Sequence, residues 1–391
     1  MLLFLGASDA LCQSNVAEFQ KVVGDKLVLE PTDFMSVEQG ETVIKLLPAL
    51  DKREIAVGGM VRVEAPAEMF LQSFRESMTS KSNPAILEIG KLSNPTSLDD
   101  FQGLTVEDRD VEDLRQCVVG DCRLKLSAPM IQRLQAEVDW SGANYRTQVT
   151  QLLKQMLVEY VRDYLARGDE ALLRYDDKAK AIRIAEEQRE LIAASSFASL
   201  FEDGNGAMKP ELTLVENAIV WSKIKFGLKP VLAINHILIY KRAQQDGAQI
   251  LIVSKQIYAN HYFDSSLALT AFMNLPGQNP GSYLFYENRS RVDGLEGPFG
   301  KFKRSIIEDK AVSSLKSILN QSQLGLANKT MNPDSAVAPV AAGWNWKRGK
   351  VLVNVVILLL WVSALVVFLS LRAYGWKKPY PRKPTLLKRV P

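Results

Sequence analysis

Residues Val351–Leu371 form a run of twenty-one positions without a charged side chain, close to the end of the 391-residue chain. At 1.5 Å per residue, a helix of this length matches a hydrocarbon core about 30 Å thick. Trp346 precedes the run and Trp376 follows it, and aromatic rings favour the two headgroup layers. The sequence therefore predicts one membrane-spanning helix over residues 351–371, with the lipid bilayer as its partner.

The distribution of basic residues predicts the orientation of this span. Three basic residues lie between 341 and 350, seven lie in the tail 372–391, and no acidic residue lies in either segment. Because positive charge favours the cytoplasmic side, we expect a cytoplasmic tail and a large domain outside the cytoplasm, at the inner membrane of a bacterium. The alternative is a cytoplasmic protein with a tail anchor.

An exported domain requires a signal at the start of the chain. Residues 1–12 resemble a shortened signal peptide: Leu2–Leu5 are apolar, and Ala10 and Cys12 place small residues before a cut at Gln13. The segment has no basic residue and contains Asp9, so the alternative is an ordinary buried strand. With cleavage at this point, residues 13–320 form the expected extracytoplasmic domain.

The two cysteines outside this segment lie five residues apart. Cys117 and Cys122 flank the sequence Val-Val-Gly-Asp, which is suited to a turn. A close pair in an exported domain predicts a disulfide, and two reduced core cysteines are the alternative. We expect no metal site, because a closed zinc site needs four ligands and the two histidines lie far away in the sequence.

Charge excludes one class of partner. The chain carries +4 in total, and the ten basic residues of 341–391 leave −6 on residues 1–340. A domain of this charge is not suited to nucleic acid. Residues 321–343 are rich in Asn, Ser, Ala, Pro and Gly, and predict a flexible linker between the domain and the membrane.

The remaining pattern predicts an α+β domain. Apolar residues spaced three and four apart predict a helical section over about residues 129–200, and a last helix is expected from Pro298 to Gln323. Alternating or apolar segments between these helices predict strands. The expected strands are Glu41–Leu47, Glu54–Glu64, Ala85–Leu92, Cys122–Leu126, Asn217–Ile224, Pro230–Arg242, Ala248–His261, Ser265–Met273 and Ser282–Arg291.

The segment Ala248–His261 indicates how the sheet is shaped. One set of alternate residues is apolar at the start and polar at the end, as a sheet curling round a cavity requires. A sheet with one face under helices and one partly wet face is the alternative. The set comprises Ile250, Ile252, Ser254, Gln256, Tyr258 and Asn260.

Residues Ile55–Glu68, a strand running into Val-Glu-Ala-Pro-Ala-Glu, resemble the START-like or helix-grip superfamily of lipid-transfer domains and polyketide cyclases. The late strands followed by a long helix resemble it as well. The resemblance implies a curved antiparallel sheet that grips the terminal helix around a hydrophobic ligand pocket. The chain departs from that pattern in the helical section at about 129–200 and in the cysteine turn.

No motif in the sequence indicates a nucleophile or a cofactor, so we expect neither. The cluster His261-Tyr262-Phe263-Asp264 offers an imidazole and a carboxylate, and the rival hypothesis is an envelope enzyme using His261 and Asp264. The leading hypothesis is non-catalytic binding of a lipid or another hydrophobic molecule. Tyr258, Asn260, His261 and Arg289 are the expected polar groups of the pocket. A third hypothesis is a structural protein that presents a surface to envelope partners.

Overall fold

The computed structural model describes residues 29–81, 85–195, 198, 209–225, 229–244, 247–275, 281–296 and 300–331. Over these ranges no helix is both long and apolar enough to cross a bilayer. The expected signal at residues 1–12, the span Val351–Leu371 and the tail 372–391 lie outside the described residues.

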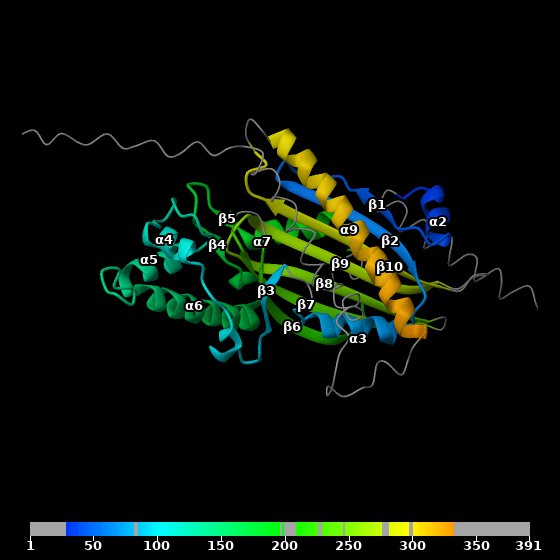
Figure 1. The fold of residues 1–391 in the computed structure, drawn as a ribbon, viewed down its shortest axis with the longest axis horizontal. Helices are drawn as coiled ribbons and strands as arrows, with labels where there is room; N and C mark the ends of the chain where they lie inside the picture. Colours follow the sequence, from blue (N-terminus) through cyan, green and yellow to red (C-terminus); the bar gives the residue numbers. More distant parts are fainter. Residues whose placement is uncertain are drawn as a thin grey trace, which may run out of the picture.

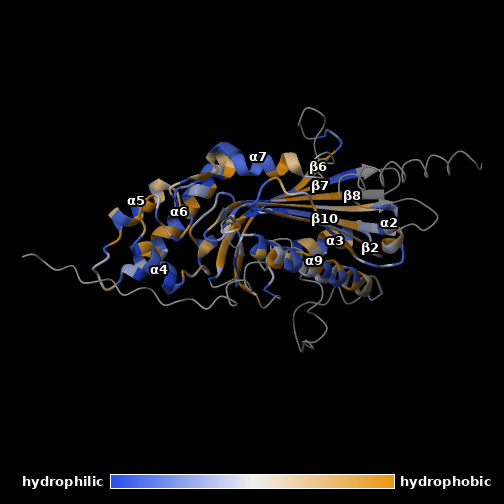
Figure 2. Cartoon of the chain, turned by 90° about the horizontal axis from the view of Figure 1, so that it is seen from above, coloured by the Kyte–Doolittle hydropathy of each residue, from blue (hydrophilic) through white to orange (hydrophobic). Residues whose placement is uncertain are grey.

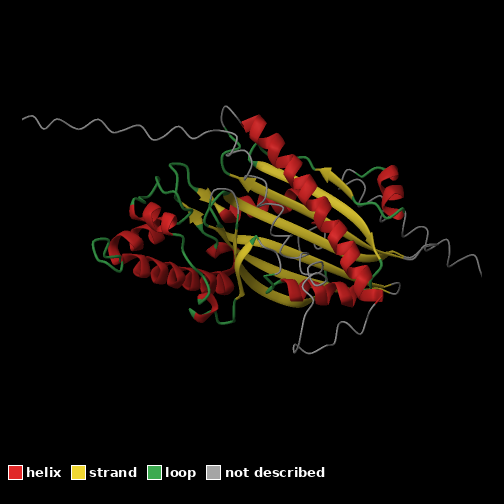
Figure 3. Cartoon of the chain, in the orientation of Figure 1, coloured by secondary structure: helices red, strands yellow, loops and turns green. Residues whose placement is uncertain are grey.

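The centre of the molecule is an eight-stranded sheet in which every neighbouring pair is antiparallel (Figure 3). The strand order is β1-β2-β10-β9-β8-β7-β6-β3, so the last five strands follow one another as a meander. The strands are β1 (Val43–Leu46), β2 (Glu54–Val63), β3 (Ile86–Lys91), β6 (Thr213–Ile224), β7 (Val231–Gln244), β8 (Gly247–Ala259), β9 (Phe263–Leu275) and β10 (Gly281–Val292).

This architecture confirms the predicted α+β class, with a large antiparallel sheet and a helix at its C-terminal side. The late strands lie within a few residues of their expected bounds because their side chains alternate or are continuously apolar. The strand expected at Cys122–Leu126 is wrong. No strand forms over residues 122–126, and the two isolated bridges nearby join Asp121, just before the segment, to Val118 and to Lys178.

Two helices cover one face of the sheet, here called the gripped face (Figures 1 and 2). They are α3 (Ala67–Ser77) and the long α9 (Gly300–Met331). Helix α9 buries Ile307, Ala311, Leu315, Ile318 and Leu319, spaced three or four apart, against the sheet. The helix continues beyond the expected end at Gln323 and enters the segment 321–343, because Leu326 is also buried in this core.

The opposite face carries a smaller core under α2 (Pro31–Glu38) and α7 (Ile184–Ala194). Figure 2 shows α7 on one side of the sheet and α9 with α3 on the other. Val37 of α2 and Leu191 of α7 pack on Met60, Leu251 and Phe285. The sheet is therefore buried on both faces, as its nearly continuous apolar strands require.

A helical layer lies at one end of the sheet (Figure 1). Its helix α6 buries the predicted stripe, including Leu153, Met156 and Leu157, and ends before Gly168, which has a positive φ of 64°. The layer begins earlier than the expected residue 129. It comprises η1 (Asp99–Phe101), α4 (Asp108–Arg115), α5 (Ala128–Glu137), α6 (Tyr145–Arg167), η2 (Gly168–Ala171), β4 (Arg174–Tyr175) and β5 (Ile182–Arg183).

Candidate functional site

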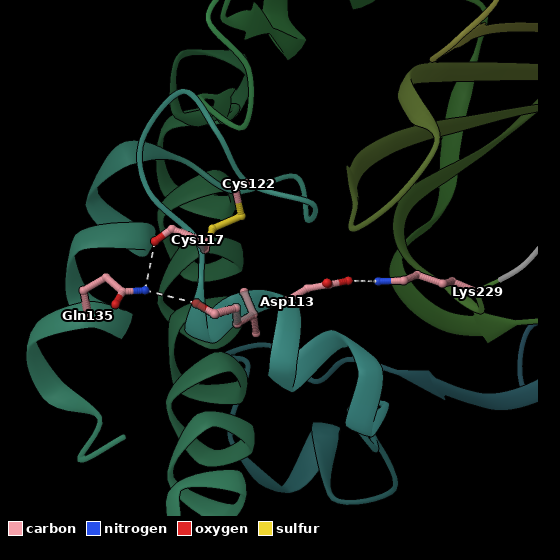
Figure 4. Close-up of a disulfide and its surroundings, with 6 residues drawn as sticks. Asp113, Cys117, Cys122, Gln135 and Lys229 are labelled. Atoms are coloured by element: carbon pink, nitrogen blue, oxygen red, sulfur yellow. Dashed lines mark hydrogen bonds and ion pairs between the residues drawn. A yellow bond between two sulfur atoms is a disulfide. The ribbon is translucent and has the colours of Figure 1, made fainter. Parts of the chain in front are cut away.

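The predicted disulfide joins Cys117 to Cys122, whose Cα atoms lie 4.5 Å apart (Figure 4). Between them the chain turns back, with Val118 N donating to Asp121 O and Gly120 at a φ of 86°. The side chain of Gln135 on α5 donates to the carbonyl of Cys117 at 2.9 Å. The disulfide is thus anchored to the helical layer.

The same turn positions acidic residues at the end of the sheet. Gly120 N donates to Asp176 O at 2.7 Å, and Cys122 N donates to Asp177 O at 2.8 Å. Lys125 lies three residues after Cys122, and its Nζ lies 5.2 Å from the centre of the Tyr175 ring. The disulfide turn therefore holds residues 175–177 beside a buried lysine.

The turn between β8 and β9, residues 260–262, is the point where these segments meet. Tyr262 has a positive φ of 60°, which is costly for a residue with a side chain. Its carbonyl accepts from Asp293 N at 2.7 Å, and its hydroxyl accepts from Lys229 N at 3.2 Å. Contacts from two other segments thus hold this backbone conformation.

Asp110 of α4 contacts two of the four residues expected in the pocket, His261 and Asn260, and it also contacts Lys229. His261 Nε2 lies 3.0 Å and Asn260 Nδ2 3.5 Å from Asp110 Oδ2, and Lys229 Nζ lies 2.7 Å from Oδ1. Burial acts to raise the pKa of Asp110, but His261 and Lys229 outweigh it and lower that pKa. Burial, followed by the charge of Asp110, raises the pKa of Tyr258.

Asp264 belongs to a neighbouring cluster. Its Oδ1 lies 2.6 Å from Lys125 Nζ and its Oδ2 lies 3.1 Å from Arg53 Nη1. Burial raises the pKa of Asp264 to about 6 against the effect of Lys125, and the charge of Asp293 adds to the rise. In Asp293 burial is outweighed by Lys125 and Lys178, so its pKa is lowered. His261 therefore pairs with Asp110, whereas Asp264 pairs with Lys125 and Arg53.

Arg289 lies apart from the other three expected pocket residues. Its guanidinium contacts Glu54 and Glu287, each at 2.7 Å, and donates to the carbonyl of Pro48. These groups lie on the face of the sheet that α2 and α7 cover, since Arg289 shares its side of β10 with Phe285. The structure gives Arg289 an ion-pair role there.

Tyr258 is also displaced from the face predicted for it. Ile234 pairs with Tyr258, but the next residue, Asn235, pairs with Gln256, so the register shifts and Ile257 is an extra residue in β8. A bulge of this kind moves the following side chains to the other face. Tyr258 accordingly packs in the core of the helical layer, while Ile250 and Ile252 pack on the gripped face.

A row of polar side chains crosses the gripped face from β6 to β10, and we call it the polar belt. Its three members on β6, β7 and β8 are buried, and each has an atom without a hydrogen-bond partner among the described residues: Ser222 Oγ, Asn235 Nδ2 and Ser254 Oγ. The register places them on neighbouring strands, since Asn235 lies two residues from the partner of each serine.

The rest of the polar belt is internally satisfied. On β9 and β10, Ser266 Oγ lies 2.8 Å from Ser290 Oγ, and Ser290 donates to Asn288 at 2.8 Å. Sequence reasoning singled out Ser254 but missed Ser222 and Asn235. Both residues could have been found in the sequence, because each is a polar residue at an inward position of an otherwise apolar strand.

Across the described ranges, no three His, Cys, Asp or Glu side chains are grouped so that they could hold a metal ion. Comparison of the chain with protein-family models, with curated proteins and with solved structures gives no match.

Proposed function

We propose that the chain binds a lipid or another hydrophobic small molecule, without catalysis, in the layer between the gripped face and helices α3 and α9. The observation that carries this proposal is the unpartnered part of the polar belt. Native proteins pair nearly all buried polar atoms with protein, water or ligand. Three unpaired atoms on adjacent strands of one face supply hydrogen bonds for a bound molecule.

The surroundings of the polar belt support a hydrophobic occupant. Phe70 of α3 stacks on Phe272 of β9, with ring centroids 4.7 Å apart. Ile237 and Ile252 continue this apolar surface on β7 and β8. A molecule with an apolar body and a small polar group suits such a layer, because pockets for small molecules combine apolar walls with a few polar groups.

The relation of α9 to the sheet supports the resemblance to the START-like superfamily. A Cβ built on Gly59 of β2 would lie 3.0 Å from Leu319 Cδ1 on α9. The helix therefore approaches the strand closely where the strand has no side chain. In this proposal the sheet is curved, α9 grips it, and the helical section between β3 and β6 is an insertion.

The partners of His261 and Asp264 support binding over catalysis. Asp110 occupies Nε2 of His261, and Lys125 and Arg53 occupy both oxygens of Asp264. A base that abstracts a substrate proton needs a free lone pair within reach of it. We infer that this cluster joins the helical layer to the sheet.

The proposal includes the location of the domain in the cell, outside the cytoplasm and next to the membrane. Disulfides persist in oxidising compartments, so the pair Cys117–Cys122 supports a domain outside the cytoplasm. In Figure 1, α9 ends at the side of the sheet away from the helical layer. A span at Val351–Leu371 would then hold the sheet near the bilayer and turn the helical layer away from it.

Native mass spectrometry of the full chain, with lipid extraction, tests the proposed function. We expect one hydrophobic molecule per chain. The matched variants are Ala268→Leu, on the gripped face of β9, and Ala271→Leu, on the opposite face of the same strand. Binding should be lost in Ala268→Leu and kept in Ala271→Leu, with folding of both checked by circular dichroism. An empty wild-type chain, or equal effects of the two variants, would overturn the proposal.

A further inference from the structure

The geometry points to an uncharged head group, bearing a hydroxyl or carbonyl oxygen, as the part of the ligand that meets Ser222, Asn235 and Ser254. This inference rests on the proposed function, and it names the chemical class of the molecule bound there. The unpaired atoms are two hydroxyls, which donate and accept, and one amide nitrogen, which donates. A hydroxyl or carbonyl oxygen matches all of them.

The polar belt contains no ionisable side chain. Its members are Ser222, Asn235, Ser254, Ser266, Asn288 and Ser290. The charged residues on this side of β6 and β7 are already paired elsewhere. Glu216 binds Arg75 and Lys91, and Lys241 binds Glu68 of α3 at 2.6 Å. No described residue of the belt could therefore neutralise a charged head.

The side chains that helices α9 and α3 bury against the gripped face are also neutral. Helix α9 turns Ile307, Leu315 and Leu319 to the sheet, and the buried Ser322 on the same side donates to its own helix at Ile318 O. Helix α3 contributes Phe70 and Phe74. Moving a carboxylate or phosphate into such surroundings costs far more than three neutral hydrogen bonds return.

The two halves of the polar belt differ in their hydrogen bonding, and this difference places the head group of the ligand. On β9 and β10 the hydroxyls of Ser266 and Ser290 bind each other, so they require no further partner. Only the half on β6, β7 and β8 is open to a ligand. The head therefore lies over these strands, and the apolar body extends towards Phe272 and α3.

A comparison of oleyl alcohol with oleate tests this inference, because the two probes share one chain and differ in the head. Binding to the full chain in amphipol is measured by native mass spectrometry at a pH at which oleate is ionised. We expect wild type to prefer oleyl alcohol at least about tenfold. Asn235→Leu and Ser254→Ala should each lower that preference about fivefold, the loss of one net hydrogen bond.

Ser266→Ala is the matched control, since Ser266 belongs to the satisfied half of the belt, and it should leave the preference unchanged. Because Ser254→Ala removes a buried polar group without a partner, it should also raise the melting temperature. A variant that binds the alcohol more weakly while being more stable has lost a ligand contact, since loss of a structural contact would lower stability. Oleate binding as tightly as oleyl alcohol would overturn the inference and leave the proposed function standing. Binding of neither probe would overturn both.

Discussion

His261 and Asp110 form a buried pair, with 3.0 Å between Nε2 and Oδ2, although 151 residues separate them in the sequence. The pair joins the turn after β8 to helix α4. Lys229 contacts both Asp110 and Asp113, and Figure 4 shows its contact with Asp113. Together with the His261–Asp110 pair, Lys229 links the sheet to the helical layer. Removing one partner of such a buried polar contact leaves the other without compensation.

Two lysines that contact the same carboxylate should differ in their effect on stability. Lys125 is buried and binds Asp264 and Asp293, whereas Lys178 is 52% exposed and binds Asp293 alone. We expect Lys125→Met to cost about 3–5 kcal/mol of unfolding free energy. Lys178→Met should cost less than about 1 kcal/mol. Urea denaturation measures both, and equal losses would contradict the role given to Lys125.

His236 should make the protein less stable in mild acid. Burial, and next the charge of Lys255, lowers the pKa of His236 to about 4 from 6.5. The unfolded chain takes up this proton first, so the stabilising contribution is complete above pH 6.5 and is lost as the pH falls towards 4.

Because the His236 ring is only partly buried, the free energy of unfolding should fall by about 1–2 kcal/mol between pH 7 and pH 5. His236→Gln removes the titrating group and keeps a donor towards Asn217, which His236 Nε2 contacts at 2.8 Å. Denaturation at both pH values should show a smaller loss in this variant. The same loss in variant and wild type would exclude His236 as the cause.

The disulfide should contribute modestly to stability. It closes a short loop, because five residues separate Cys117 from Cys122 in sequence. The chain-entropy relation gives about 2 kcal/mol for a loop of this size. The double variant Cys117→Ser and Cys122→Ser should lose about that amount in urea denaturation. Thiol labelling of the unfolded, unreduced wild type should leave both cysteines unmodified, and their labelling would refute the bond.

Gly59 should be required for the close approach of α9. Its Cβ would lie 2.5 Å from Ile44 Cδ1 and 3.0 Å from Leu319 Cδ1. We expect Gly59→Ala to cost about 1–3 kcal/mol through overpacking and to speed amide exchange in α9. Gly103→Ala, where a Cβ meets nothing within 4 Å, is the control. Unchanged exchange in α9 would show that the helix does not depend on this contact.

The sequence is most informative where one local pattern determines the structure. The existence of strands β6 to β10, the stripe of α6 and the pair Cys117–Cys122 all follow from spacing along the chain, and all are present. The segment 321–343 lacks such a pattern. Helix α9 nevertheless extends to Met331, because burial of Leu326 depends on a core that distant strands build.

The candidate site depends on contacts that spacing does not reveal. The bulge at Ile257 moves Tyr258 away from the face that alternation assigns to it, and alternation alone contains no sign of an extra residue. Asp110, the common partner of His261, Asn260 and Lys229, comes from a helix that no strand pattern connects to them. Only the fold brings these groups together.

Photolabelling tests the location of the ligand most directly. A long-chain alcohol that carries a diazirine at the end of its hydrocarbon tail is bound to the full-length protein and irradiated. Peptide mass spectrometry then identifies the labelled residues. The proposal predicts labels on α3, β8 and β9 at residues that share a core with Phe70 and Phe272, and their loss in Ala268→Leu but not in Ala271→Leu. Labels confined to Val351–Leu371 and to exposed side chains would contradict it.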